Sequence, residues 1–238
     1  LVARARLVLA RVDIRLGTEY RQCRARKIQG LYVILDPQVA QQDVLKVADE
    51  ALEGGARAIQ WRDKSHDKGD QLSTCERLME LCSERDATFI VNDHADLAVS
   101  CEAHGLHLGQ HDLPLAKARS LLASTQLIGN SNATLQEAEE AQGFGVDYIA
   151  VGAIFPTGTK LNTRPAGLET VRRIREVVEV PIIAIGGINE DNVEKVICAG
   201  ADGGAVISAV SGAQDPREAA RRIVEGIENA RARKGSAP

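Results

Sequence analysis

The chain has 238 residues, a length typical of a single (β/α)8 barrel and long enough to bury one large hydrophobic core. Hydrophobic residues make up 44% of it and aromatic residues 3%, which excludes a disordered chain and predicts a core of aliphatic side chains. The net charge of −4 argues against a surface built to bind nucleic acid. The sequence holds no run of about 18 apolar residues that would predict a membrane span.

The first 29 residues differ in composition from the rest of the chain, because they are rich in arginine and poor in acidic residues. Such a bias is typical of an organelle transit peptide, but those peptides are also rich in serine and this segment contains none. We therefore expect residues 1–29 to be a basic N-terminal extension from an over-extended start, weakly ordered and loosely packed. The catalytic domain is expected at residues 30–238, and removal of residues 1–27 is expected to leave activity nearly intact.

From residue 31 onward, short apolar runs alternate with longer helical patterns. The runs are apolar throughout, as in parallel strands that are buried on both faces. Strands are predicted at residues 31–35, 58–61, 89–91, 105–108, 127–129, 148–151, 182–185 and 205–207.

Helices are predicted between these strands, near residues 41–53, 68–85, 94–102, 114–122, 134–142, 167–178, 190–199 and 215–231. Thr134 and Glu137 have the spacing of a capping box at the start of one of them. The strict alternation predicts the α/β class, as a single TIM barrel, (β/α)8, with a parallel sheet and right-handed crossovers. An open doubly wound sheet is the alternative, but no G-x-G-x-x-G motif follows the first strand.

The five cysteines form no C-x-x-C pair, and their odd count argues against a disulfide framework. We therefore expect a reducing, cytoplasmic setting. Cys101 and Cys198 fall on predicted helices and are interpreted as core residues.

Polar residues gather where the predicted strands end, which is the face of a (β/α)8 barrel that carries active sites. Gly186 and Gly187 follow the seventh strand, and Ser208 follows the eighth. The loops after these two strands often hold a phosphate, because glycine turns let backbone N–H groups approach an anion. A tight turn without a ligand is the alternative.

Asp93 and Asp112 follow neighbouring predicted strands, so their carboxylates are expected to converge. Mg²⁺ is usually held by one or two carboxylates together with water and substrate phosphates. The alternative for each is a helix N-cap. Their shared position predicts a Mg²⁺ site.

Cations and hydroxyls accompany these acids at the same face. Arg62, Lys64 and Lys160 suit phosphate oxygens, although a solvated lysine is the usual alternative. Thr157, Thr159 and Ser131 add hydroxyls. No nucleophile–base pair is evident, and His107, inside the fourth predicted strand, is interpreted as packed rather than catalytic.

Six phrases together resemble the thiamin phosphate synthase (thiamin phosphate pyrophosphorylase) family over residues 30–228. They are Q-W-R-D-K at 60–64, V-N-D at 91–93, G-L-H-L-G-Q-H-D-L-P at 105–114, I-F-P-T-G-T-K at 154–160, A-I-G-G-I at 184–188 and V-I-S-A-V at 206–210. The resemblance implies a Mg²⁺-dependent transferase of thiamin biosynthesis. It would join hydroxymethylpyrimidine diphosphate to thiazole phosphate, releasing diphosphate and giving thiamin phosphate.

The resemblance also implies roles for individual residues. The pyrimidine diphosphate would be bound by Gln60, Arg62, Lys64, Asn92, Ser131 and Lys160, of which Arg62, Ser131 and Lys160 are the expected catalytic residues. The thiazole phosphate would be bound by Thr157, Thr159, Gly187, Ile207 and Ser208, and Mg²⁺ by Asp93 and Asp112. The expected partners are phosphorylated small molecules rather than nucleic acid or a membrane, and the sequence leaves a homo-oligomer open.

Two positions depart from the family pattern. His94 stands where the family often has arginine, and Ala133 stands where it often has a histidine two positions after the serine. A related thiazole tautomerase uses a histidine at that second position, so Ala133 argues against this alternative. A non-catalytic barrel that binds thiamin phosphates is the other alternative, and the retained acids and cations argue against it.

Overall fold

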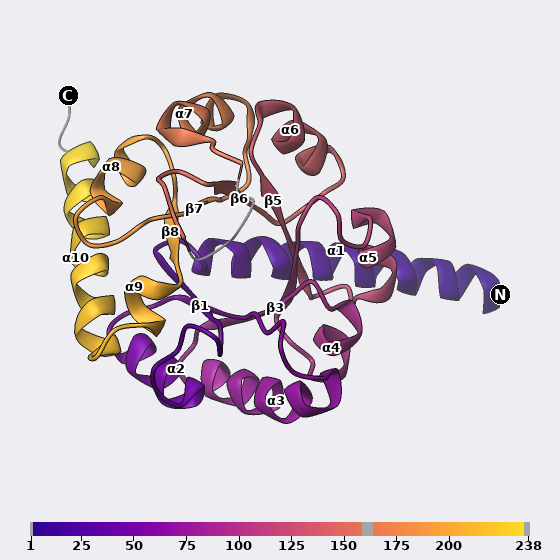
Figure 1. Ribbon diagram of the computed structural model, residues 1–238. Helices are drawn as coiled ribbons and strands as arrows, with labels where there is room; N and C mark the ends of the chain where they lie inside the picture. Colours follow the sequence, from indigo (N-terminus) through magenta and orange to yellow (C-terminus); the bar gives the residue numbers. More distant parts are fainter. Residues whose placement is uncertain (1, 159–163, 236–238) are drawn as a thin grey trace.

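The computed structural model describes residues 2–158 and 164–235 and shows a closed barrel of eight parallel strands in sequence order, surrounded by helices (Figure 1). The fold predicted from the alternation is confirmed. The strands are β1 (Leu31–Leu35), β2 (Ala58–Trp61), β3 (Thr88–Asn92), β4 (Gly105–Leu108), β5 (Leu127–Asn132), β6 (Tyr148–Gly152), β7 (Ile182–Ile185) and β8 (Gly203–Val206).

The helices are α1 (Val2–Lys27), α2 (Val44–Glu53), α3 (Lys68–Glu84), α4 (Ala95–Ser100), α5 (Leu115–Leu121), α6 (Leu135–Gly143), α7 (Gly167–Val177), α8 (Val193–Cys198), α9 (Ser208–Ser211) and α10 (Pro216–Gly235). Those from α2 to α8, together with α10, follow the predicted pattern. Both α1 and the short α9 were not predicted.

Four strands differ from the sequence-based boundaries: β3 is one residue longer at each end, β6 is one residue longer at its end, and β5 and β8 differ more. Strand β5 continues to Asn132, which places Ser131 on the strand rather than in the loop after it. Strand β8 begins two residues earlier than expected, at Gly203. Glycine is a poor strand former, but a Cβ atom at Gly203 would lie 2.5 Å from the carbonyl oxygen of Gly30. The close approach of the chain before β1 therefore requires glycine at this position.

Two apolar clusters sit on opposite sides of the sheet. The larger lies between the strands and the helices. The smaller fills the barrel interior and includes Tyr32, Ile90, Leu127 and Tyr148. Because side chains alternate along a strand, Ser131 points to the same interior side as Leu127. The polar residues at the strand ends therefore stand directly above a packed apolar plug.

Helix α1 crosses the end of the barrel opposite the site, as its course behind the strands in Figure 1 shows. Its last residue to pack inward, Ala25, joins the interior cluster together with Ile28. Arg21 pairs with Asp147, just before β6, through an Nε–Oδ1 distance of 2.9 Å. We expected a weakly ordered extension here. Alanine, leucine and arginine favour helix, and the docking contacts join residues too distant in sequence to be recognised from its pattern.

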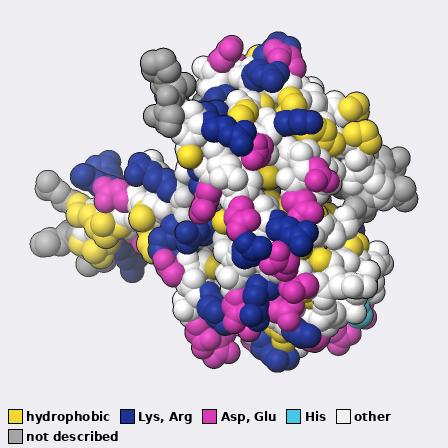
Figure 2. Space-filling model, turned by 90° about the vertical axis from the view of Figure 1, so that its left-hand side faces the viewer, with side chains coloured by type: hydrophobic (Ala, Val, Ile, Leu, Met, Phe, Trp, Pro, Cys, Tyr) yellow, Lys and Arg dark blue, Asp and Glu magenta, His cyan; other side chains and the backbone are white. Residues whose placement is uncertain are grey.

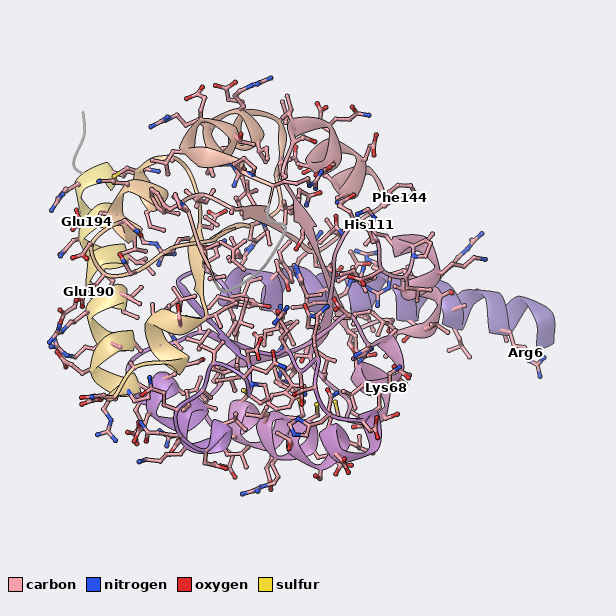
Figure 3. All side chains as sticks on the ribbon, in the orientation of Figure 1. Arg6, Lys68, His111, Phe144, Glu190 and Glu194 are labelled. Carbon is pink, nitrogen blue, oxygen red and sulfur yellow. The ribbon has the colours of Figure 1, made fainter. Side chains whose placement is uncertain are left out.

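The first half of α1 extends beyond the barrel. Figure 2 shows the helix standing out from the body of the molecule, and Arg6 lies far out along it in Figure 3. Leu9 is 68% exposed and Leu16 is 59% exposed. Among the residues of α1 whose burial is described, the buried ones thus lie in the second half of the helix.

Three smaller expectations can be compared with the structure. The Thr134 side chain accepts a hydrogen bond from the Glu137 backbone N–H, which confirms the cap, and the Glu137 carboxylate accepts a hydrogen bond from the Ala133 N–H. Cys101 is buried as expected, but the prediction for Cys198 was wrong because it lies exposed at the end of α8. Among the helices of the described residues, none has the length and apolar content to cross a membrane.

Candidate active site

A cavity of about 410 Å³ opens at the carboxyl ends of the strands. It contains five of the residues predicted from the sequence: Ser131, Thr157, Gly187, Ile207 and Ser208. They come from β5, from the loop after β6, and from the ends of β7 and β8. The structure therefore brings together residues that lie up to 77 positions apart in the sequence, from Ser131 to Ser208.

The glycine turn after β7 is shaped by packing. Gly187 has a φ of 64°, and a Cβ atom there would lie 2.6 Å from the carbonyl oxygen of Pro156. Backbone bonds of 2.9 Å from Ile154 to Ile185 and 3.0 Å from Phe155 to Gly186 tie the loop after β6 to this turn. The glycines thus hold the Thr157 loop against the wall of the cavity.

Backbone donors are also available at this wall. Among the described residues, no protein acceptor is found for the N–H groups of Gly187, Ser208 or Ala209. Gly187 and Ser208 line the cavity. Unpaired backbone N–H groups beside a cavity are suited to bind an anion.

Asp93 and Asp112 converge as predicted. Burial raises the pKa of Asp112, and the neighbouring Asp93 carboxylate raises it further, while a bond of 2.7 Å from the Gly109 N–H opposes this. Asp93 has a φ of 62°, in the left-handed region that non-glycine residues seldom adopt. Lys64 Nζ lies 3.1 Å from Asp93 Oδ2. Two adjoining carboxylates that repel one another form a donor pair suited to a divalent cation.

The acid pair and the cavity share one loop. Gly109 and Gln110 line the cavity, while the Gly109 N–H holds Asp112. Among the residues that the structure describes, no group of three or more histidine, cysteine, aspartate or glutamate side chains could enclose a metal ion. A cation at Asp93 and Asp112 would therefore need oxygens from water or from a bound ligand.

Three other predicted residues are placed outside the lining of the cavity. Gln60 is buried and donates from Nε2 to the Tyr32 hydroxyl at 2.7 Å. Arg62 pairs with the buried carboxylate of Asp36. Asn92 ends β3 and is half-buried. Thr159 and Lys160 lie outside the described residues, so their roles stay predictions.

Sequence reasoning missed several residues of this region. Asp36 follows β1, a strand after which no site residue was predicted. Arg164 lines the cavity and pairs with Glu137 at 2.5 Å and 3.0 Å. It follows Lys160 by four positions, and this proximity was a usable signal. His107 was considered only a packed residue, yet its Nε2 lies 2.8 Å from Ser131 Oγ.

Comparison with known proteins identifies the family. The family model described as thiamine monophosphate synthase matches residues 31–210. The chain belongs to the thiamine monophosphate synthase family. The thiamine-phosphate synthase of Moorella thermoacetica is 46% identical to it over 203 residues, covering 84% of this chain and 97% of that protein.

Two further relatives agree with this membership. The thiamine-phosphate synthase of Methanospirillum hungatei is 46% identical and covers 82% of this chain and 96% of that protein. The solved thiamine phosphate pyrophosphorylase from Pyrococcus furiosus matches with a TM-score of 0.81 at 41% identity, covering 86% of this chain and 98% of that one. The family match begins at the first residue of β1, so α1 lies outside it.

Proposed function

We propose that this chain joins hydroxymethylpyrimidine diphosphate to thiazole phosphate, releasing diphosphate and forming thiamin phosphate. Membership of the thiamine monophosphate synthase family supports the reaction. The observation that carries it to particular residues is the shared cavity. Ser131 lies on one wall, Gly187 and Ser208 lie on another, and the Asp112 loop flanks them.

The thiazole phosphate is assigned to the side of the cavity formed after β6, β7 and β8. The backbone N–H groups of Gly187 and Ser208, which find no acceptor among the described residues, and the hydroxyls of Thr157 and Ser208 are donors for phosphate oxygens. Ile207 supplies an apolar contact beside them. This arrangement agrees with the general preference of barrels for phosphate after the last two strands.

The diphosphate is assigned to the side of the acid pair. Asp93 and Asp112 would hold Mg²⁺, which neutralises the charge that develops on a leaving diphosphate. Lys64 already lies against Asp93 and can turn to a phosphate oxygen. Arg62 adds a guanidinium held in place by Asp36. The predicted contribution of Lys160 would add to this cluster.

The chemistry needs no strong protein base. The bond between the pyrimidine methylene carbon and the diphosphate oxygen breaks, and the electron pair leaves with the diphosphate. The thiazole nitrogen supplies the electron pair of the new C–N bond and keeps a positive charge, so no proton is removed. The protein's task is to align the two rings and to stabilise the leaving group. Ser131 and His107 lie within hydrogen-bonding distance, but the reaction requires neither of them to act as a nucleophile or as a base.

Ala133 disfavours the tautomerase alternative. Its backbone N–H bonds to Glu137, and its side chain has no group that can move a proton. The retained acid pair and cations disfavour the non-catalytic alternative, and Mg²⁺-dependent release of diphosphate would separate it from the synthase.

Steady-state kinetics of diphosphate release would test the proposed sites separately. Ser208→Val should raise the KM for thiazole phosphate about 10-fold or more and change the KM for the pyrimidine diphosphate little. Asp112→Asn should lower kcat about 10²-fold. If Ser208→Val raised only the KM for the pyrimidine diphosphate and Asp112→Asn raised only the KM for thiazole phosphate, the two substrates would be assigned to the wrong sides of the cavity.

A further inference from the structure

Five polar side chains form one hydrogen-bonded chain across the barrel interior. Gln60 Nε2 lies 2.7 Å from the Tyr32 hydroxyl, which lies 3.1 Å from the Tyr148 hydroxyl. The Tyr148 hydroxyl lies 3.0 Å from His107 Nδ1, and His107 Nε2 lies 2.8 Å from Ser131 Oγ. This hydrogen-bonded network thus links β2, β1, β6, β4 and β5 and ends at Ser131, which lines the cavity.

The packing around this chain gives it little freedom. Gln60, Tyr32, Tyr148 and His107 are all buried. The rings of His107 and Tyr148 stack with centroids 5.6 Å apart. A Cβ atom at Gly129 would lie 2.0 Å from Tyr148 Cζ, so the glycine in β5 reserves the space that this ring occupies. Each member is therefore held by its neighbours, and Ser131 is the member that lines the cavity.

The donor-to-acceptor direction of these hydrogen bonds is set at the Gln60 end of the network. The amide of Gln60 donates to Tyr32, and burial raises the pKa of Tyr32 and Tyr148, so each phenol keeps its proton. Every proton then has an acceptor only if Tyr32 donates to Tyr148 and Tyr148 donates to His107 Nδ1. With Nδ1 accepting, Nε2 carries the ring proton.

The remaining proton is that of Ser131. Because His107 Nε2–H donates to Ser131 Oγ, the hydroxyl proton of Ser131 is left for an acceptor in the cavity. If the hydrogen bonds ran in the opposite direction, both Gln60 and Tyr148 would donate to the Tyr32 hydroxyl, and the proton of Tyr32 would have no acceptor in the network. The order of the network thus makes Ser131 a donor toward the ligand rather than an acceptor.

We propose, on the basis of the function proposed above, that His107 is a positioning residue that fixes the Ser131 hydroxyl as a hydrogen-bond donor to the pyrimidine diphosphate. His107 does not touch the substrate in this assignment and acts only through Ser131. Its packing within β4, expected from the sequence, is what gives it this role.

A double-mutant cycle on His107 and Ser131 tests the assignment. Ser131→Ala should lower kcat on the order of 10²-fold. His107→Asn, which keeps a polar group near Nδ1 but withdraws the one near Nε2, should lower kcat about 10-fold to 100-fold with the thiazole phosphate KM unchanged. In the Ser131→Ala background, His107→Asn should cost no more than about 2-fold, because residues that act as a unit are not additive.

Two further variants separate positioning from folding. His107→Gln, whose amide reaches the Nε2 position, should recover part of the loss. Tyr148→Phe keeps the ring that faces Gly129 and removes only the hydroxyl. It should lower kcat about 3-fold to 10-fold, again only when Ser131 is present.

The outcomes distinguish this inference from the proposed function. If the fold losses of kcat in the two single variants multiplied in the double variant, or if His107→Asn had a normal kcat, the role of His107 would be overturned while the proposed reaction stood. An unmutated protein that forms no thiamin phosphate would overturn both.

Discussion

Replacing Arg21 with alanine should show that α1 is part of the folded barrel. The Arg21 and Asp147 side chains are 12% and 8% exposed, and they meet at 2.9 Å. Arg21 also donates to the Ser124 carbonyl. Removing one partner of a buried ion pair leaves an uncompensated charge, which typically costs about 3–5 kcal/mol.

The lower end of that range applies here. Asp147 would keep a bond of 2.8 Å from the Ile128 N–H and a distant contact of 3.7 Å to Arg119. We expect Arg21→Ala to lower the free energy of unfolding by about 3 kcal/mol. With an unfolding entropy of about 2.1 cal/mol/K per residue, this corresponds to a fall in Tm of roughly 6 °C.

Arg15→Ala is the matched control. Arg15 lies on the same helix and pairs with Glu19 at 3.2 Å, but the two side chains are 83% and 59% exposed. Its loss should change stability by less than about 0.5 kcal/mol. Urea unfolding and thermal melts of both variants measure the difference. Equal shifts in the two variants would refute the docking of α1 on the barrel.

Three further predictions concern the site and the acid stability of the protein. Asp112→Asn should remove the stabilisation of the folded protein by Mg²⁺. For the unmutated protein this stabilisation reaches about 2.7 kcal/mol at a Mg²⁺ concentration 100 times the dissociation constant. If Mg²⁺ raised the Tm of the variant as much as that of the unmutated protein, this carboxylate would be excluded as a ligand. Gly187→Ala should raise the thiazole phosphate KM about 10-fold, since its Cβ would lie 2.6 Å from the Pro156 oxygen, whereas Gly143→Ala, with open space around its Cβ, should not. Burial lowers the pKa of His104 to about 4, and its Nδ1 accepts the Phe89 N–H at 3.0 Å. The neutral His104 ring should therefore contribute at most about 3 kcal/mol to the free energy of unfolding, fully above about pH 6.5 and progressively less as the pH falls toward 4. His104→Gln should flatten the dependence of the free energy of unfolding on pH over this range.

The barrel could be predicted from the sequence because each unit carries its own signal. Apolar runs such as Ile182–Ile185 and helix caps such as Thr134 are local features. Helix α1 shows what local signals leave out. Its helical propensity is legible, but its docking depends on Asp147 and Ser124, which lie more than 100 positions away.

The candidate site likewise has features that the sequence predicts and contacts that it does not. Its residue types and their places at strand ends could be predicted, and the pairing of Asp93 with Asp112 followed from the barrel order. The partners of these side chains could not. The bond of Arg62 to Asp36 and the chain from Gln60 to Ser131 depend on which side chains meet inside a closed barrel, and the distances across it are not encoded in any one segment.

The most direct test of the proposed reaction is to identify its products. The purified protein would be incubated with hydroxymethylpyrimidine diphosphate, thiazole phosphate and Mg²⁺, and thiamin phosphate and diphosphate would be quantified by chromatography and mass spectrometry. We predict that the two products form in a one-to-one ratio, only when both substrates are present, and that chelation of Mg²⁺ stops their formation reversibly. The absence of thiamin phosphate from the complete mixture, with folded protein confirmed by circular dichroism, would contradict the proposed function.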